Sequence, residues 1–457
     1  MKYMELDLSK IKNVHFIGIG GIGISAVARM MLHDGKKVSG QDMQDSEIIQ
    51  ELKKLGAEIT VGQSFENIPK NTDLIVYTIA IEYYDPELFK KLSAIGGPAS
   101  GWKNTIYVRS YPQMLDILSR DKYTIAVSGT HGKTTTTAMI AQILRDSGND
   151  PTVIVGSLLL GTKSNFIAGK SKYFVVEACE YRRSFLNIDP KILVIVNIDA
   201  DHLDYYKDIE DIKNAFHELT MKVQEDGFIV CNPEDNNISD VIKDAKAKII
   251  NYQDYFNKDL KLKIPGIHNK KDAACASAVA DLIEVKKEDI NKALSLFPGT
   301  WRRFEYKGGT RSGTKIYDDY AHHPTEISST LEGFREIYPK VDSWKITVVF
   351  QPHLFSRTKL LLDDFAKSFG DADKILILPI YYAREEDNGS ISSKILSDEI
   401  NKYQNDHNSK AFDSFKAVEK ELQGMVLSNK DIIVTMGAGE AFKIADNLLK
   451  LYPQGLN

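Results

Sequence analysis

Short apolar runs alternate with stretches of helical periodicity along almost the whole chain. The runs are rich in Val and Ile and predict strands at 14–17, 74–77, 124–127, 173–177, 193–197, 346–350, 375–378 and 432–435. Strands that are apolar on both faces and are followed by helical patterns are typical of mainly parallel sheets with helices on both sides. The pattern therefore predicts an α/β protein.

Two interruptions of this alternation indicate domain boundaries. A chain of 457 residues is too long for one compact core. A short helix at 112–119 ends just before a new strand and a glycine-rich loop, and a Pro298-Gly299 turn is followed by a Gly308-Gly309 pair. We predict three domains, at residues 1–118, 119–307 and 308–457.

The first chemical motif follows the strand at 124–128 and opens a helix. It reads Gly129-Thr130-His131-Gly132-Lys133-Thr134-Thr135. Glycines let backbone N–H groups converge on phosphate oxygens, the helix N-terminus favours negative charge, and the lysine adds a cation. A hydroxyl of Thr134 or Thr135 is a candidate Mg²⁺ ligand. Val127 stands where the usual loop has glycine, so this is a shortened variant, and a glycine turn before a capped helix is the alternative.

A second glycine loop follows the strand at 14–17. Gly18-Ile19-Gly20-Gly21-Ile22-Gly23 matches G-x-G-x-x-G, and Asp42 stands nineteen residues after Gly23 at the end of the next strand. Such a loop binds the pyrophosphate of NAD or of a UDP-sugar, with the acidic residue on a ribose hydroxyl. Tight packing of the helix on the strand is the alternative.

Titratable residues also follow later strands. Glu177 ends one strand and His202 comes shortly after the next. If both strands belong to the sheet that carries the phosphate loop, these side chains face a triphosphate. Carboxylate oxygen suits Mg²⁺ well, whereas imidazole is a less usual ligand. A surface ion pair and a structural histidine are the alternative interpretations.

Further polar groups cluster near the second boundary and beyond it. Arg302 and Arg303 lie in Trp-Arg-Arg-Phe, and the fixed donor geometry of a guanidinium suits either one to bind the ligand of another domain. A solvated or ion-paired surface arginine is the alternative for each. The segments 318–326 (DDYAHHPTE) and 350–357 (FQPHLFSR) each follow a strand-like run. Two histidine-bearing loops in one domain are too rich in polar groups to be plain connectors.

Composition narrows the possible partners and location. Lys and Arg number 58 against 63 Asp and Glu, and a net charge of −5 argues against a nucleic-acid partner. Cys179, Cys231 and Cys275 are far apart, as expected for reduced thiols. The chain has no apolar run of about 18 residues and no signal-peptide pattern, so we expect no membrane insertion and a cytoplasmic location.

Taken together, the motifs resemble those of the Mur ligase family. The resemblance extends from Val14 to about Ile444 and is carried by HFIGIGGIG, SGTHGKTTTT, VEACEYRRSFL, NIDADHLD, GIHN, TWRRF, DDYAHHPTEI, FQPHLFSRT and TMGAGE. It implies a Rossmann-like UDP-sugar domain, a central P-loop ATPase-type domain and a Rossmann-like α/β domain that binds the amino acid. The implied reaction joins L-alanine to the carboxylate of UDP-N-acetylmuramate through an acyl phosphate, with ATP and Mg²⁺, in peptidoglycan precursor synthesis.

The resemblance also implies residue roles. Lys133, Glu177, His202 and His322 would be catalytic. Thr134 and Glu177 would be ligands of one Mg²⁺, and Glu177 and His202 would be ligands of a second. ATP would contact Gly129 to Thr135, His268, Asn269, Arg303 and Asp319. The UDP moiety would contact Gly20, Gly21, Ile22, Gly23, Asp42 and Ser46, and the amino acid Tyr320, His322 and Arg357. Asp272, Ile79 and Leu354 depart from the family pattern, and with Leu354 in place of a second arginine Arg357 would bind the substrate carboxylate alone.

Three other functions fit part of the sequence. A relative that recycles a whole tripeptide onto UDP-muramate shares the phosphate loop and Ala-His-His-Pro. A nicotinamide-dependent oxidoreductase would use Gly18 to Gly23 and Asp42 but leaves Lys133, Glu177 and His202 unexplained. A non-catalytic nucleotide-binding scaffold is the third. L-alanine, glycine and L-serine are candidate amino acids, and either a monomer or a homodimer is expected.

Overall fold

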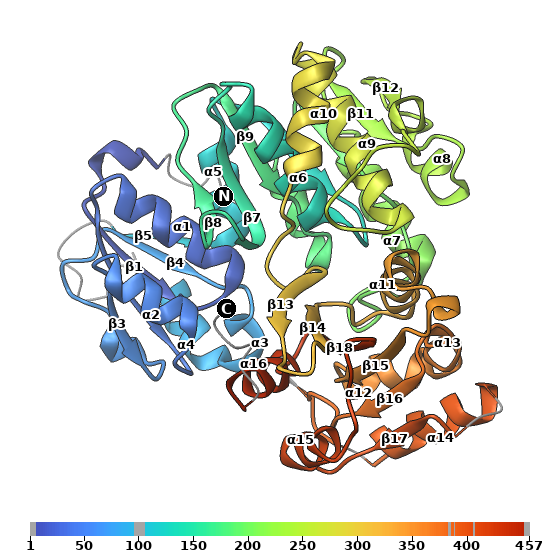
Figure 1. Ribbon diagram of the computed structural model, residues 1–457. Coiled ribbons are helices and arrows are strands. Elements are labelled where there is room, and N and C mark those ends of the chain that lie inside the picture. Colours follow the sequence, from blue (N-terminus) through green and yellow to red (C-terminus); the bar gives the residue numbers. More distant parts are fainter. Residues whose placement is uncertain (1–5, 96–105, 383–384, 388, 405–406, 452–457) are drawn as a thin grey trace. The chain divides into compact units, whose positions relative to one another are not determined.

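The computed structural model describes residues 6–95, 106–382, 385–387, 389–404 and 407–451. They form three sheets flanked by helices (Figure 1). The chain divides into two compact units. One comprises the described residues up to Asp201 with Asp208–Tyr255 and Ala274–Leu294, and the other comprises His202–Lys207, Phe256–Ala273 and the described residues from Ser295 onward. The domain boundaries expected after residues 118 and 307 remain predictions.

The first sheet has five parallel strands in the order β3-β2-β1-β4-β5. The strands are β1 (Asn13–Ile17), β2 (Lys37–Asp42), β3 (Glu58–Val61), β4 (Leu74–Tyr77) and β5 (Tyr107–Ser110). The helical segments are η1 (Leu8–Lys10), α1 (Ile22–His33), α2 (Glu47–Lys54), η2 (Phe65–Asn67), α3 (Ile81–Tyr84), α4 (Pro86–Ser93) and α5 (Tyr111–Ser119). The central strand β1 is almost wholly buried, and the glycine loop leaves its carboxyl end.

The second sheet has the order β12-β11-β10-β6-β9-β7-β8, and only the β7–β8 pair is antiparallel. Its strands are β6 (Tyr123–Ser128), β7 (Thr152–Leu159), β8 (Ser164–Ile167), β9 (Tyr173–Glu177), β10 (Ile192–Ile195), β11 (Phe228–Cys231) and β12 (Lys248–Asn251). The accompanying helical segments are α6 (Lys133–Asp146), η3 (Tyr181–Asn187), α7 (Ile209–Thr220), α8 (Asn236–Ile242), η4 (Tyr252–Tyr255), α9 (Ile267–Leu282) and α10 (Lys287–Leu296). Because β9 and β10 flank β6, the segments that follow all three strands leave the same edge of the sheet.

The third sheet has the order β13-β14-β18-β15-β16-β17, with only β13–β14 antiparallel. Its strands are β13 (Glu305–Gly309), β14 (Lys315–Asp319), β15 (Lys345–Phe350), β16 (Lys374–Ile377), β17 (Ser409–Ala411) and β18 (Asp431–Met436). Its helical segments are α11 (Pro324–Ile337), η5 (Lys340–Asp342), α12 (Phe355–Leu360), α13 (Leu362–Ser368), α14 (Ser393–Gln404), α15 (Phe415–Gln423) and α16 (Phe442–Leu451). The predicted α/β class with mainly parallel sheets is confirmed.

The ends of two strands differ from the prediction. Asp318 and Asp319 were expected in the loop after a strand, but they are the last two residues of β14, because its parallel pairing with β18 continues to Asp319. The strand expected at 193–197 ends at Ile195, and Asn197 lies beyond it in a loop. That shorter strand frees the Asn197 side chain to bond with the phosphate loop.

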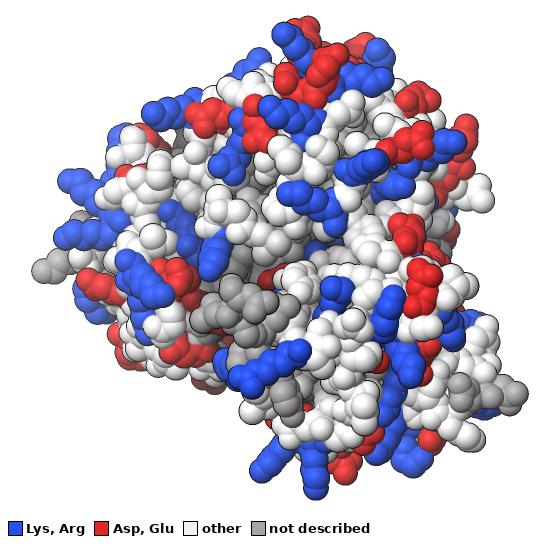
Figure 2. All heavy atoms as spheres, in the orientation of Figure 1, with Lys and Arg blue, Asp and Glu red and all other residues white. Residues whose placement is uncertain are grey.

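The surface carries both signs of charge. On the face drawn in Figure 2, Lys and Arg side chains are interspersed with Asp and Glu. Among the described residues, no helix has the length and apolar character needed to cross a membrane.

Candidate active site

The phosphate loop connects β6 to α6, and two of its glycines have backbone angles that favour glycine. Gly129 has a φ of 136°, and a Cβ on it would lie 3.0 Å from the carbonyl oxygen of Asn197. Gly132 precedes the first turn of α6 with a φ of 82°. Side chains are strained in this left-handed region, so both positions favour glycine. The loop therefore presents backbone N–H groups at a helix N-terminus, as predicted.

Lys133 is bound by oxygen atoms within this loop and by a buried carboxylate. Its Nζ donates to the carbonyl oxygens of Gly129 (2.6 Å) and Thr130 (2.9 Å), and it lies 2.9 and 3.0 Å from the two oxygens of Glu180. Burial opposes the charged form of Lys133, but the charge of Glu180, assisted by Cys179 and Glu177, outweighs it and raises the pKa of Lys133. The ammonium is therefore kept charged.

Glu180 is a site residue that the sequence reasoning missed. Its side chain is only 3% exposed, and its carboxylate forms an ion pair with Lys133. The available signal was its position in the sequence, three residues after Glu177 in the same segment beyond β9.

Glu177 and Thr134 meet beside the phosphate loop. The Thr134 hydroxyl lies 3.1 and 3.0 Å from the two carboxylate oxygens of Glu177, and the Gly156 N–H donates to one of them at 2.7 Å. A Cβ on Gly156 would lie 2.6 Å from both oxygens, so only glycine leaves room for the carboxylate. The structure thus brings together the residues predicted to bind the first Mg²⁺, and it adds Gly156.

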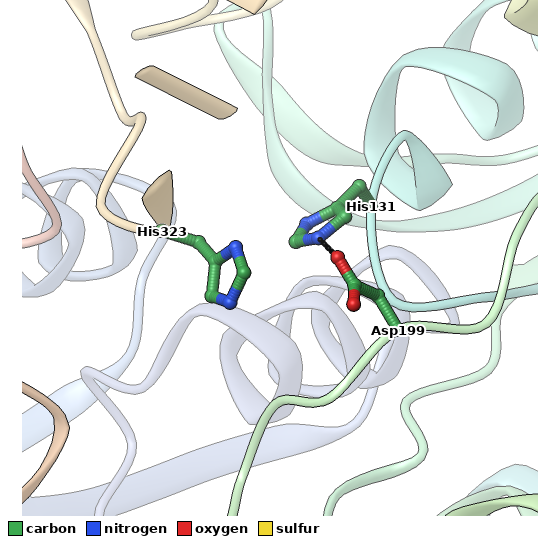
Figure 3. Close-up of side chains that lie close together, drawn as sticks. All are labelled: His131, Asp199 and His323. Atoms are coloured by element: carbon green, nitrogen blue, oxygen red, sulfur yellow. Dashed lines mark hydrogen bonds and ion pairs between the residues drawn. The ribbon is translucent and has the colours of Figure 1, made fainter. Parts of the chain in front are cut away.

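His131 is fixed by the segment that follows β10. Its backbone N–H donates to the Asn197 side chain at 2.8 Å, and Asn197 donates back to the His131 carbonyl oxygen at 3.0 Å. Figure 3 shows its imidazole beside the carboxylate of Asp199, with His131 Nε2 3.3 Å from Asp199 Oδ2. Thr130 accepts from the Asp199 N–H at 2.8 Å. Asn197 and Asp199 therefore tie the phosphate loop to a second strand.

The glycine loop after β1 is built differently. Gly18 has a φ of 75°, and a Cβ on it would lie 2.4 Å from the Thr78 side chain. Asp42 accepts a hydrogen bond from the Gly20 N–H at 2.8 Å, and Ser46 caps α2. Gly21 precedes Ile22, the first residue of α1. Asp42 therefore orders this loop, and its predicted contact with a UDP ribose remains a prediction.

In the second unit, His268 and Asn269 lie at the start of α9 and form a local pair. Asn269 Nδ2 donates to His268 Nε2 at 3.0 Å. The other ring nitrogen, Nδ1, is buried and has no hydrogen-bond partner among the described residues. Burial, and then the charge of Arg303, lower the pKa of His268 to about 4. His268 is therefore neutral near pH 7, with an unsatisfied N–H.

The two adjacent arginines have different roles. Arg302 is 3% exposed; it donates to Asp318 at 2.7 Å and to the carbonyl oxygens of Gly437 and Gly439. Arg303 is more exposed, 3.7 Å from Glu326 and 5.1 Å from the centre of the Tyr320 ring. Arg302 thus anchors the loop after β18, whereas Arg303 is the more exposed of the two and lies beside Glu326 and Tyr320.

Asp319 is buried near Arg303. Its oxygens accept from the backbone N–H groups of Phe304 (2.7 Å) and Ala321 (2.8 Å). Burial raises the pKa of Asp319 to about 6, although Arg303 and these N–H groups favour the carboxylate. The predicted contact of Asp319 with the nucleotide ribose remains a prediction.

Tyr320, His322 and Arg357, predicted to surround the amino acid, are connected through His353. The His322 ring lies 5.3 Å from that of Tyr320 and 6.0 Å from that of His353, and Arg357 Nη1 lies 3.3 Å from His353 Nδ1. Tyr381 stacks on His353 at 5.5 Å. His353 and Tyr381 were absent from the predicted set, although His353 lies in the FQPHLFSR motif.

The environment of His322 determines its tautomer. Its Nδ1 lies 3.0 Å from the Tyr320 carbonyl oxygen and 3.2 Å from Glu326 Oε2. Both partners are acceptors, so Nδ1 carries a proton and, in the neutral ring, Nε2 has the free lone pair. The neighbouring Leu354 is 2% exposed, has a φ of 71° and contributes no polar group.

His202 belongs to the segment His202–Lys207 of the second unit, and its φ is 54°. Glu177 belongs to the first unit, so the second Mg²⁺ site that these residues would share remains a prediction. Asp272, the departure in the predicted adenine loop, is buried in α9.

The mainly parallel sheets, the lysine-bearing phosphate loop and the oxygen pair beside it define the class: a phosphate-loop nucleotide-binding α/β protein. Three family models match the chain: "Mur ligase family, catalytic domain" at residues 13–123, "Mur ligase middle domain" at 127–297 and "Mur ligase, glutamate ligase domain" at 302–439. The chain belongs to the Mur ligase family.

Individual relatives match over almost the full length. The chain is 41% identical to the UDP-N-acetylmuramate–L-alanine ligase of Acetivibrio thermocellus, over 97% of each chain. It is 42% identical to that of Clostridium tetani, over 98% of this chain and 100% of the relative. The crystal structure of UDP-N-acetylmuramate–alanine ligase from Thermotoga maritima matches with a TM-score of 0.76 and 27% identity, over 96% of this chain and 99% of that one.

Proposed function

We propose that this chain is an ATP-dependent ligase that joins L-alanine to the carboxylate of UDP-N-acetylmuramate in peptidoglycan precursor synthesis. The observation that carries the proposal is the phosphate loop, in which a charged, half-buried Lys133 lies beside the Thr134–Glu177 pair. The full-length similarity to ligases of this name supports the choice of substrates.

The reaction activates a poor electrophile. A carboxylate oxygen of the UDP-sugar attacks the γ-phosphorus of ATP, the bond to the β-phosphate oxygen breaks, and ADP leaves. The amine of L-alanine then attacks the carbonyl carbon of the acyl phosphate and loses a proton, and inorganic phosphate departs to leave the amide. Lys133 stabilises the negative charge on the transferred phosphoryl group.

The Thr134 hydroxyl and the Glu177 carboxylate are hard oxygen donors of the kind that Mg²⁺ binds. When bound there, Mg²⁺ would neutralise charge on the phosphate oxygens. Gly156 orients Glu177 for this task through its N–H group. In this proposal His202 supplies a ligand to a second ion.

Four further residues are proposed to contact ATP: His268, Asn269, Arg303 and Asp319. The unpaired, buried Nδ1–H of His268 is a donor for a base nitrogen, and Asn269 fixes the ring. The more exposed of the two arginines, Arg303, contacts the phosphates, and Asp319 contacts the ribose.

His322 and Arg357 carry the amino-acid step. The Nε2 atom of His322, whose Nδ1 faces two acceptors, accepts the proton that the attacking amine releases. Arg357, which is 9% exposed, pairs with the carboxylate of L-alanine without help from Leu354. The cytoplasmic location and the monomeric or homodimeric state remain predictions.

Phosphate release from ATP tests the proposal. Purified protein is assayed with Mg²⁺ and UDP-N-acetylmuramate, and with L-alanine, glycine, L-serine or the tripeptide in turn. We expect release that requires both the UDP-sugar and an amino acid, fastest with L-alanine. Fastest release with the tripeptide would assign the recycling reaction, and an NAD(P)H absorbance change without ATP turnover would assign an oxidoreductase.

A further inference from the structure

Tyr111 lies at the carboxyl edge of the first sheet, where parallel sheets bind ligands. It is the first residue of α5 and directly follows β5. A capping box fixes the start of this helix, with Gln113 Oε1 accepting from the Ser110 N–H at 2.9 Å and Pro112 in the first turn. The capping box therefore fixes the backbone position of Tyr111.

The ring of Tyr111 packs against the glycine loop that we assign to the UDP-sugar. A Cβ built on Gly23 would lie 2.8 Å from both Cζ and the hydroxyl oxygen of Tyr111. Real Cβ atoms do not approach other atoms so closely, so the absence of a side chain at Gly23 is what lets the tyrosine hydroxyl reach this loop.

The helix that Tyr111 begins also packs against the segment that follows the phosphoryl-transfer residues. α5 packs against η3, the segment that follows Glu177 and Glu180. Burial, and then the charges of Glu177 and Cys179, raise the pKa of Tyr111, so the hydroxyl keeps its proton and can donate it. Tyr111 therefore contacts the loop assigned to the UDP-sugar and begins a helix that packs against the segment following Glu177.

The hydroxyl is available to a ligand. Tyr111 is half-buried, and among the described residues no group forms a hydrogen bond with its hydroxyl. In the proposed reaction, the group that must lie between the UDP loop and the phosphate loop is the carboxylate of the UDP-sugar. A protonated phenol is a suitable donor to it because it adds no charge that would weaken the nucleophile.

We propose that Tyr111 is a substrate-binding residue whose hydroxyl donates a hydrogen bond to the reacting carboxylate of the UDP-sugar. This inference rests on the proposed function. It assigns to Tyr111 the recognition of the acidic end of the substrate, whereas the glycine loop binds the diphosphate end.

Tyr111→Phe tests the inference because it removes only the hydroxyl. We expect the variant to bind UDP-N-acetylmuramate about tenfold more weakly in a calorimetric titration and to lose about 10- to 100-fold in kcat/KM for this substrate. UDP has no carboxylate, so its Kd should change less than twofold, as should the KM for ATP. Tyr173→Phe is the matched control, since Tyr173 begins β9, whose other end carries Glu177.

Two results would overturn the inference. Tyr111→Phe could bind UDP-N-acetylmuramate as the wild type does, or it could lose affinity for UDP equally, which would indicate a packing role. In either case a wild type that forms the amide leaves the proposed function intact. A wild type that releases no phosphate with any amino acid would instead contradict the proposed function itself.

Discussion

The two glycine loops of this chain share a backbone design and differ in the side chains around them. Each leaves the carboxyl end of a central parallel strand and leads into a helix, α1 in one case and α6 in the other. The loop before α6 leads directly into Lys133, which is paired with Glu180, and lies beside Thr134 and Glu177. The loop before α1 contains no charged residue and is ordered by Asp42.

The difference shows why the glycine pattern alone does not specify a ligand. Backbone N–H groups at a helix N-terminus bind a pyrophosphate of any nucleotide. Phosphoryl transfer also needs a cation at the transferred group and oxygen ligands for a metal. Only the loop before α6 has both, so we assign phosphoryl transfer to it and binding of the UDP-sugar to the other.

The largest effect is expected from Lys133→Ala. Loss of the cation should lower kcat for phosphate release about 10²-fold or more, because Lys133 is the cationic side chain that we assign to the transferred phosphoryl group. Affinity for UDP-N-acetylmuramate, measured by calorimetry, should change less than twofold. A variant that retains more than about a tenth of the wild-type kcat would remove Lys133 from the mechanism.

Glu180→Ala should mainly affect stability and the position of Lys133. The variant leaves the largely desolvated ammonium of Lys133 without the Glu180 carboxylate, which should lower the free energy of unfolding by about 3 kcal/mol. Thermal unfolding followed by circular dichroism measures the loss. Glu51→Ala is the control because Glu51 pairs with Lys54 at the surface, and its midpoint should equal that of the wild type. Equal midpoints for both variants would show that the Lys133–Glu180 pair contributes nothing to stability.

Gly156→Ala should raise the Mg²⁺ concentration that the reaction requires. The added methyl would overlap the Glu177 carboxylate and displace it, so the Mg²⁺ concentration for half-maximal rate should rise about tenfold or more. Gly161→Ala, at a position where a Cβ meets nothing within 4 Å, should leave the requirement unchanged. An unchanged Mg²⁺ requirement in Gly156→Ala would argue against Glu177 as a ligand.

Asp42→Ala should have the smallest effect. Loss of its bond to the Gly20 N–H loosens the loop before α1 and should raise the KM for UDP-N-acetylmuramate about fivefold, with the KM for ATP unchanged. Asp42→Asn keeps an acceptor oxygen and should restore most of the affinity. A rise in the KM for ATP alone would contradict the assignment of the two loops.

The sequence predicted the fold and the local motifs well, and predicted the pairing of distant side chains poorly. The alternation of apolar runs with helical periodicity, and the Val and Ile content of those runs, located the strands. The spacing of the glycines located both loops. Gly156 and Glu177 are 21 residues apart, and the sequence does not indicate that a missing Cβ at one position makes room for the other. Glu180 was missed for the same reason, since its partner is 47 residues away.

Arg302 and Arg303 illustrate a second limit. Adjacent arginines are equivalent in a sequence pattern, and only burial distinguishes the one paired with Asp318 from the one near Glu326. The family resemblance selected Arg303, and the structure gives a physical reason for that choice. Asp318 and Asp319 were expected after the strand and not within it. Acidic residues are rare in buried strands, and here Arg302 and backbone N–H groups satisfy them.

The assignment of different ligands to the two loops is tested most directly by titrating the wild type, Lys133→Ala and Asp42→Ala with a non-hydrolysable ATP analogue and with UDP-N-acetylmuramate. We predict that Lys133→Ala lowers only the affinity for the ATP analogue and that Asp42→Ala lowers only the affinity for the UDP-sugar. The assignment would be contradicted if one variant lost affinity for both ligands equally. Saturable micromolar binding of NAD(H) to the wild type would also contradict it.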